Sequence, residues 1–341
     1  MPRCGTQCYL CDLPIRIDSY EGCSHACKYC FAKKFTDISK ISLGEKPEKL
    51  KQFIEGKRPK ECNWCDWNIP IHWGGMSDPF QPCEKTHKLS LEYLKILKET
   101  QYPFVVSTKG KLVIEEPYLT LLSECNCVVQ ISMICDKYDK MEEGAPTFEE
   151  RLNMLTVLSG KVKRTIVRVQ PYMHEVFEDV YNNLERFKEA GAYGVIIEGM
   201  KFKSKKAGLV KVGGDLTYPY KLILSDFLKL KKRAHELGLK IYAGENRIRK
   251  YGDSLTCCGI DGLEDFKPNT FNLNHLLNGD TQVKATPKQQ EFGTGECFAS
   301  LVQATVKGRE LRAQSFAYDM LKYYKDNKTK IDKAMGVTQD D

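Results

Sequence analysis

The sequence lacks several features that would assign it to common classes of protein. Its 341 residues contain no run of about 18 apolar residues, the length that a membrane span needs, and the first ten residues lack the apolar stretch of a signal peptide. No Gly-x-Gly-x-x-Gly follows the first predicted strand and no Gly-Lys-Ser/Thr loop occurs, so the usual dinucleotide and nucleoside-triphosphate motifs are missing. Neither sign of charge dominates, because 52 Lys and Arg stand against 45 Asp and Glu. We expect a cytoplasmic protein with at most a weak preference for anionic partners.

Cysteine is the residue in excess. Fifteen occur, and six fall within the first thirty residues, namely Cys4, Cys8, Cys11, Cys23, Cys27 and Cys30. With 42% hydrophobic residues the chain can build a core without disulfide bonds, and cytoplasmic thiols stay reduced. The thiols are therefore predicted to be metal ligands, and the amino-terminal region to carry the chemistry.

The hydrophobic pattern between residues 15 and 250 is that of repeated βα units. Strands are predicted at 15–20, 69–74, 104–107, 128–133, 166–171, 195–198 and 240–243, and helices at 89–99, 117–123, 148–158, 176–190 and 221–237. Because right-handed crossovers return each strand beside the previous one, the pattern favours an α/β fold with a partial parallel barrel of the (β/α)6 type. An open doubly wound sheet is the alternative.

The chain divides into three predicted parts. Residues 1–14 form a cysteine-rich head, residues 15–250 the barrel, and residues 251–341 a carboxyl-terminal appendage with a terminal helix over about 296–325.

A cysteine triplet follows the first predicted strand. Cys23, Cys27 and Cys30 have the spacing C-x3-C-x2-C, just after a Glu21-Gly22 turn. Three thiolates on one tight loop can bind three irons of a four-iron cluster and leave the fourth open to an external ligand. A zinc site is the alternative, since cysteine triplets also occur in zinc modules.

This spacing, with Tyr29 before the third cysteine, resembles the signature of the radical S-adenosylmethionine superfamily. The Ser77-Asp78 turn, Thr108-Lys109, Ser132 and the run 170–175 are similar to the spore photoproduct lyase and DNA-repair-photolyase-like branch, over about residues 15–200. The resemblance implies a [4Fe-4S] cluster whose open iron binds S-adenosylmethionine. It also implies one-electron cleavage of this cofactor to a 5′-deoxyadenosyl radical.

The predicted cofactor site follows from the resemblance and from the carboxyl ends of the strands, where barrels of this type build their active sites. The cluster is expected on Cys23, Cys27 and Cys30. The residues expected along S-adenosylmethionine are Tyr29, Gly74, Gly75, Ser77, Asp78, Lys109, Ser132 and Arg168. Among them, Lys109 is suited to pair with the methionyl carboxylate and Ser132 with a ribose hydroxyl.

One departure from the branch concerns hydrogen transfer. In spore photoproduct lyase a cysteine just before the Thr-Ser-Asp turn returns a hydrogen atom to the product radical, and Gly75 stands at that place here. Cys83 and Cys135 are the candidates for this role if their loops fold inward. Otherwise each is a small buried apolar residue.

The substrate side of the site is predicted at the ends of the later strands. Tyr172, Glu198 and Glu245 are the catalytic candidates there, against the alternative that each is a hydrogen-bonded residue of the barrel rim. A basic loop over 201–206, followed by Lys211, would lie on the same face and meet phosphates, or else be solvated surface.

The remaining cysteines leave three alternatives open. Cys4, Cys8 and Cys11 repeat the C-x3-C-x2-C spacing, and with a further ligand from Cys83 or the Cys257-Cys258 turn they would hold a second iron–sulfur cluster. The paired C-x2-C motifs at 8–11 and 62–65 would instead bind zinc. The third alternative is no second metal.

The sequence therefore predicts a radical S-adenosylmethionine enzyme that abstracts hydrogen from a nucleic acid or nucleobase-like substrate, as in the lyase. Its electrons are expected from a reductant such as flavodoxin or ferredoxin. The alternatives are the same radical chemistry on a peptide or small metabolite, and a metal-stabilised nucleic-acid-binding protein without catalysis.

Overall fold

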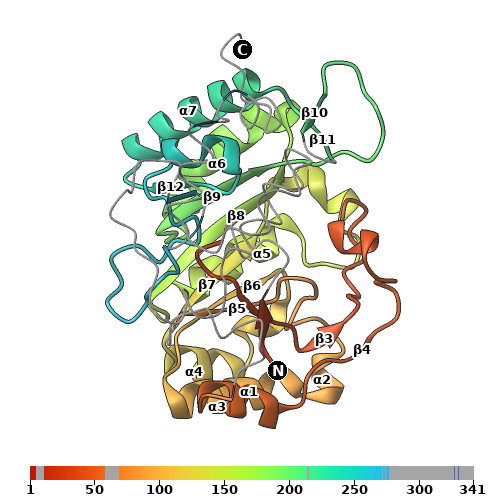
Figure 1. The fold of residues 1–341 in the computed structure, drawn as a ribbon, viewed down its shortest axis with the longest axis vertical. Helices are drawn as coiled ribbons and strands as arrows, with labels where there is room; N and C mark the ends of the chain where they lie inside the picture. The colour runs from red at the N-terminus through yellow and green to blue at the C-terminus, as the bar shows by residue number, and fades with distance from the viewer. Residues whose placement is uncertain are drawn as a thin grey trace.

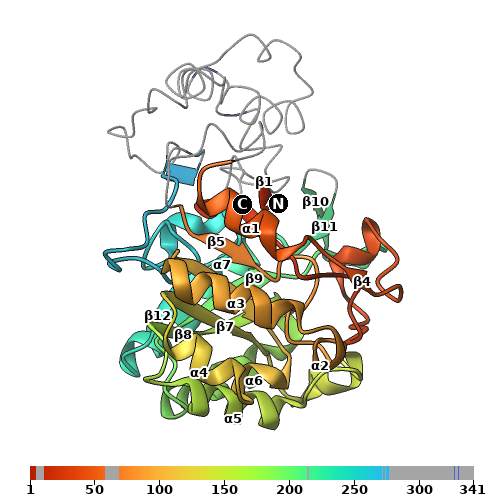
Figure 2. The ribbon, with the colours of Figure 1, turned by 90° about the horizontal axis from the view of Figure 1, so that it is seen from below.

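The computed structural model describes residues 1–4, 11–57, 69–212, 215–270, 272, 274, 275, 326 and 329. Their framework is one curved sheet with the strand order β1-β2-β5-β6-β7-β8-β9-β12 (Figures 1 and 2). The strands are β1 (Arg3–Cys4), β2 (Ile15–Ile17), β5 (Ile71–Trp73), β6 (Phe104–Thr108), β7 (Cys127–Ser132), β8 (Arg164–Tyr172), β9 (Gly194–Gly199) and β12 (Lys240–Ala243). The strands from β2 to β12 pair in parallel, and β1 pairs antiparallel to β2.

Helices lie between successive strands and cover the outside of the sheet (Figure 2). They are α1 (Pro47–Ile54), α2 (Glu84–His87), α3 (Leu89–Thr100), α4 (Tyr118–Ser123), α5 (Phe148–Leu158), α6 (Phe177–Glu189) and α7 (Tyr220–Glu236). Local signals explain several boundaries. Thr147 and Glu150 form a reciprocal capping box at the start of α5, and Gly238 takes a positive φ of 71° just after α7.

The core packs aromatic rings between the sheet and these helices. The fully buried Trp73 lies 6.0 Å from Phe104, 5.8 Å from Tyr93 and 5.6 Å from Phe80, measured between ring centroids. Burial of such large side chains removes enough apolar surface from water to fix the strands and helices in one arrangement.

Two short antiparallel strand pairs lie outside the main sheet. β3 (Tyr20–Glu21) pairs with β4 (Ser42–Leu43), and β10 (Val210–Val212) pairs with β11 (Asp215–Thr217). Within the described ranges β12 has β9 as its only strand neighbour, so the barrel is open between β12 and β1.

The predicted α/β fold with a partial parallel barrel is confirmed, with seven parallel strands in the sheet. The predicted strand 15–20 is wrong in extent, because β2 ends at Ile17 and Tyr20 belongs to β3. Between them the Asp18 carboxylate accepts hydrogen bonds from the Met76 and Ser77 backbone, which turns the chain out of the sheet. The helices α1 and α2 and both short antiparallel pairs were not predicted. The predicted helix at 296–325 lies outside the described residues, and the domain boundaries stay predictions.

In the part of the chain that the structure describes, no helix has the length and apolar character needed to cross a bilayer.

Candidate functional site

The cysteine triplet occupies a loop at the carboxyl end of β2. Cys23, Cys27 and Cys30 all carry free thiols. The loop is closed by the Cys30 N–H, which donates to the Cys27 carbonyl over 3.1 Å, and by Ala26, which adopts a positive φ of 50°. Its first turn is fixed where the Cys23 N–H donates to the Ile38 carbonyl over 2.8 Å. The backbone thus holds three thiols on one short stretch of chain.

A second segment clamps this loop from the side. It consists of residues 141–144, which begin at the last residue of the 3-10 helix η5 (Asp136–Met141), after β7. The Lys28 N–H donates to the Met141 carbonyl over 2.8 Å, and His25 Nδ1 lies 2.9 Å from the Gly144 carbonyl. A Cβ at Gly144 would collide with the Ser24 carbonyl oxygen, so only glycine allows this approach. We refer to residues 141–144 as the clamp segment.

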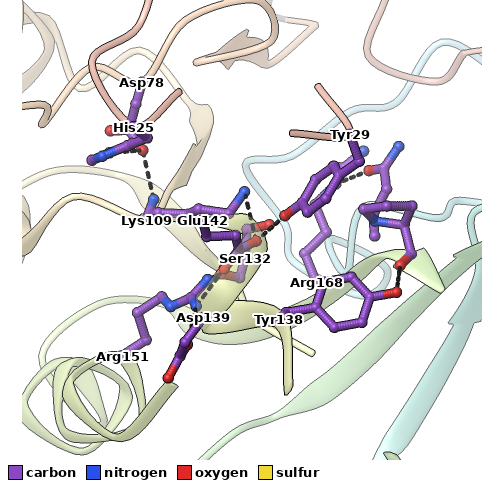
Figure 3. Close-up of polar contacts among 12 residues, drawn as sticks. His25, Tyr29, Asp78, Lys109, Ser132, Tyr138, Asp139, Glu142, Arg151 and Arg168 are labelled. Carbon is purple, nitrogen blue, oxygen red and sulfur yellow. Dashed lines mark hydrogen bonds and ion pairs between the residues drawn. The ribbon is translucent and has the colours of Figure 1, made fainter. Parts of the chain in front are cut away.

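Glu142 is the centre of the clamp segment (Figure 3). Its carboxylate is 1% exposed, lies 2.5 Å from the Arg151 guanidinium and 3.7 Å from Lys109 Nζ, and accepts a hydrogen bond from the Tyr29 hydroxyl. Burial raises the pKa of Glu142, and the neighbouring Arg151 opposes that rise. Arg151 is fully buried and also donates to the Ser132 carbonyl over 2.8 Å. One ion-pair network therefore joins the cysteine loop, the end of β6, the end of β7 and helix α5.

Asp78 secures the same loop from the other side. It accepts hydrogen bonds from the Thr108 hydroxyl over 2.7 Å and from the Lys109 N–H over 2.6 Å, and it lies 3.1 Å from His25 Nε2. Burial alone would raise the pKa of Asp78, but His25 and these donors lower it to about 2. The carboxylate is therefore ionised, and all of these contacts are with the protein itself.

The Gly74–Ser77 turn lies against the cysteine loop. The Ser77 hydroxyl donates to the Gly22 carbonyl. Gly74 has a φ of 85°, and a Cβ there would collide with the Ser107 carbonyl. A Cβ at Gly75 would meet nothing closer than Arg16, at 3.6 Å. The turn is thus tight at Gly74 and has room at Gly75.

A row of polar side chains connects the middle strands. His72 lies 3.0 Å from the Ser107 hydroxyl, which donates to Gln130 Oε1 over 2.8 Å, and Arg168 donates to the same oxygen over 2.9 Å. Arg168 also lies 3.8 Å from Glu198. Burial, together with the positive charges of Arg16 and Arg168, lowers the pKa of His72 well below its usual value. His72 is therefore neutral at neutral pH.

Sequence reasoning missed the central members of these networks. Gln130 was detectable, because a polar residue inside the apolar run Val128-Val129-Gln130-Ile131 is unusual. Glu142 and Arg151 gave no such signal, since charged residues are common in the loop and helix where they occur.

The predicted catalytic side chains are dispersed. The buried Tyr172 hydroxyl donates to Asp226 on α7 over 2.7 Å, and Glu245 pairs with Arg247 over 2.6 Å. Cys135 is fully buried and Cys83 is half-buried before α2, and burial raises the pKa of each thiol to about 11. Of the predicted catalytic residues, only Glu198 contacts the polar row around Arg168, and the roles of all five stay predictions.

Metal binding at the cysteine loop depends on the arrangement and the chemistry of its donors. Among the residues that the structure describes, no three Cys, His, Asp or Glu side chains are gathered closely enough to form a finished ligand set. The donor chemistry of the loop nevertheless fits an iron–sulfur cluster, because three unpaired thiols share one loop.

Comparisons of the sequence with other proteins give distant relatives. No protein-family model matches the chain. It is 26% identical over 212 residues to uncharacterised proteins of Mycobacterium tuberculosis and Mycobacterium bovis, covering 58% of this chain and 62% of theirs. An uncharacterised protein of Methanocaldococcus jannaschii is 24% identical over 174 residues, again covering 62% of the relative. The matches thus span less than two thirds of the curated relatives.

Comparison of the structure assigns a class of fold, the partial α/β barrel of the radical S-adenosylmethionine type. The fold is similar to that of spore photoproduct lyase. A cysteine-to-serine variant of that enzyme matches with a TM-score of 0.53 at 17% identity, over 68% of this chain and 77% of that one. The lyase complexed with dinucleoside spore photoproduct matches with a TM-score of 0.52 at 16% identity. The resemblance drawn from the cysteine motif is therefore confirmed at the level of the fold.

Proposed function

We propose that this protein is a radical S-adenosylmethionine enzyme whose [4Fe-4S] cluster is held by Cys23, Cys27 and Cys30. The observation that carries the proposal is the place of these thiols. They lie on one clamped loop at the carboxyl end of β2, in a fold shared with spore photoproduct lyase. The carboxyl ends of parallel barrel strands are where such folds build active sites.

The chain's own residues would bind and orient the cofactor. When bound, cluster and S-adenosylmethionine together supply a 5′-deoxyadenosyl radical. Lys109 is 15% exposed, with its ammonium 5.7 Å above the Tyr29 ring and 3.7 Å from Glu142. It is thereby held at the edge of the cysteine loop, where it can pair with a carboxylate. Glu142 fixes both Lys109 and Tyr29, so it orients two of the predicted cofactor residues.

The substrate that we propose is a nucleic acid or a nucleobase-like compound. The polar row of Gln130, Arg168 and Glu198 offers donors and acceptors of the kind that read the edge of a planar base. Exposed lysines at 201, 203, 205 and 206 follow β9 directly, and Phe202 of the same loop packs 5.2 Å from Tyr218. A basic loop with an aromatic residue beside the strand ends suits a phosphate backbone.

We propose flavodoxin or ferredoxin as the class of reductant. Phe31 follows Cys30 directly and Phe35 comes four residues later, and the two rings are 48% and 68% exposed. Lys33 and Lys34 stand beside them on the 3-10 helix η2 (Phe31–Lys34). An exposed apolar pair with lysines next to the cluster loop suits an acidic electron carrier.

The test is anaerobic reconstitution of the full chain with iron and sulfide, followed by reduction in the presence of S-adenosylmethionine. We expect 5′-deoxyadenosine by liquid chromatography, and none above background for Cys27→Ala. Release that survives Cys27→Ala would reject the proposal.

The substrate class is tested separately by binding of a single-stranded oligonucleotide at increasing salt. Neutralising Lys201, Lys203 and Lys205 should weaken binding and flatten its salt dependence. The control neutralises Lys229 and Lys232, which belong to the exposed face of α7 and should have little effect. It is compared with the double variant at Lys201 and Lys203, so that two charges are removed in each case. Equal effects of both sets would remove the basic loop from the proposal.

A further inference from the structure

A second group of thiols lies outside the site described above. Cys11 precedes β2, and Cys257 and Cys258 follow β12, yet the structure brings them together. Cys257 Sγ and Cys258 Sγ are 3.9 Å apart, and Cys11 interacts electrostatically with both. Among the described residues the edges of the sheet are β1, which pairs with β2, and β12, so this group lies across the open side of the barrel.

The turn that carries Cys257 and Cys258 is anchored from inside the sheet. Gln130 on β7 donates to the Cys258 carbonyl over 3.0 Å. Arg164 on β8 donates to the Gly259 and Asp261 carbonyls over 2.9 and 2.7 Å. Cys258 is 4% exposed. The position of the thiols is therefore set by the barrel rather than by the turn alone.

Two arginines flank the thiols. Arg16 on β2 lies beside Cys11, and Arg249, in the 3-10 helix η7 (Asn246–Tyr251), lies beside Cys257. Arg249 is only 5% exposed. In both arginines the Nε–H is buried and has no hydrogen-bond partner among the described residues. Arg249 also donates through Nη2 to the Gly244 carbonyl over 3.1 Å and to Asn246 Oδ1 over 3.0 Å. A buried Nε–H without an acceptor costs free energy, so each of these two Nε atoms points to a further acceptor beside the thiols.

We propose that Cys11, Cys257 and Cys258 are ligands of a second iron–sulfur cluster, with Arg16 and Arg249 as hydrogen-bond donors to its sulfur atoms. Thiolate-ligated clusters are anionic and are tuned by N–H donors to their sulfurs. As with the cysteine loop, the described side chains are not gathered closely enough to count as a complete metal site. The argument for a cluster here is chemical, because three thiols lie close to two arginine Nε–H groups that have no acceptor. Cys8 shares the C-x2-C motif with Cys11 but lies outside the described residues.

This cluster would lie beside the substrate side of the barrel. Arg16 separates the thiols from Gly75, with its Cδ 3.6 Å from the position of a Cβ there, and Arg168 of the polar row interacts electrostatically with Cys258. The proposal stands on the thiols and arginines and does not depend on the radical chemistry proposed above.

The test counts metal in four forms of the full chain after anaerobic reconstitution. These are the unchanged protein, the triple variant Cys23→Ser, Cys27→Ser, Cys30→Ser, the double variant Cys257→Ser, Cys258→Ser, and the double variant Cys125→Ser, Cys127→Ser. The last is the control, because its thiols are buried near carbonyls of Leu94 and Leu122, away from both groups. Iron, sulfide and zinc are measured per chain, with Mössbauer spectra for cluster type and circular dichroism for folding.

We expect about eight irons in the unchanged and control proteins, and about four in each of the other two. The triple variant keeps Cys11, Cys257 and Cys258. Iron that remains in this variant and gives the Mössbauer spectrum of an iron–sulfur cluster would support the second cluster. If the Cys257→Ser, Cys258→Ser variant fails to fold, Cys11→Ser takes its place, and its iron content should likewise fall to about four per chain.

If the triple variant loses all of its iron, or binds about one zinc per chain in place of iron, the proposal of a second cluster is wrong. Neither result contradicts the cluster proposed for Cys23, Cys27 and Cys30. Iron that depends only on Cys257 and Cys258 would support the second cluster and reject the function proposed for the loop.

Discussion

The two groups of thiols are assembled in opposite ways. Cys23, Cys27 and Cys30 follow one another on a single loop, and the clamp segment holds that loop by short hydrogen bonds. Cys11 and the Cys257-Cys258 pair come from opposite sides of the barrel opening and meet only when the whole sheet has formed. A local loop keeps its geometry as long as its immediate neighbours stay, whereas an assembled group depends on every strand between its parts. We therefore expect the two groups to respond differently to the same kind of damage.

The largest effect is expected from Arg151→Met, which breaks the network behind the clamp segment. Arg151 is fully buried and Glu142 is 1% exposed, so the variant leaves a buried carboxylate without its guanidinium. The free energy of unfolding should fall by about 3–5 kcal/mol. Denaturant unfolding measures this. Arg186→Met is the control, since its pair with Glu149 is largely exposed and should contribute about 0–1 kcal/mol. Equal losses of unfolding free energy in the two variants would show that the buried Arg151–Glu142 pair stabilises the protein no more than a surface ion pair does.

A smaller loss is expected from Gly144→Ala. The added methyl group would overlap the Ser24 carbonyl and push the clamp segment away from the cysteine loop. Overpacking of this kind costs about 1–3 kcal/mol in unfolding free energy. Gly75→Ala is the comparison, because a Cβ there meets only ordinary contacts with Arg16 at 3.6 and 3.7 Å. Gly75→Ala should leave the unfolding midpoint unchanged. If Gly144→Ala is as stable as the unchanged protein, the clamp segment does not pack against the cysteine loop as closely as the structure indicates.

The smallest effect is expected from Asp253→Asn, which loosens the segment leading to Cys257. Asp253 accepts from the Ile241 N–H over 2.8 Å and pairs with Lys231 and His235 over 3.1 and 2.8 Å. Burial would raise its pKa, but these partners lower it below the usual value. Its stabilisation is therefore complete above the unfolded pKa of about 3.9 and is lost as the pH falls through the lower folded pKa.

The variant should cost about 1–2 kcal/mol at pH 7, and the difference from the unchanged protein should shrink toward pH 3. Unfolding curves across this range measure it. Iron bound through Cys257 should fall while iron on the cysteine loop stays constant. A pH-independent difference would show that the carboxylate charge is not what holds the segment.

Local sequence signals predicted much of the fold. The helix predicted at 148–158 and the strand predicted at 240–243 have the bounds that the structure gives α5 and β12. A capping box begins the first, and β-branched and aromatic residues favour the second. The strand predicted at 15–20 was too long, because its alternation continued past Asp18 while the Met76 and Ser77 N–H groups captured that carboxylate. Such a contact between distant residues leaves no trace in local periodicity.

The sequence by itself determined the cysteine loop and the order of strands and helices, since spacing and hydrophobic period are properties of neighbouring residues. Only the tertiary structure placed Glu142 against Tyr29 and Lys109, joined Gln130 to Arg168, and brought Cys11 within electrostatic range of Cys257 and Cys258. The physical reason is that buried charges and thiols acquire their partners when the sheet closes around them, and those partners come from parts of the chain that no local pattern connects.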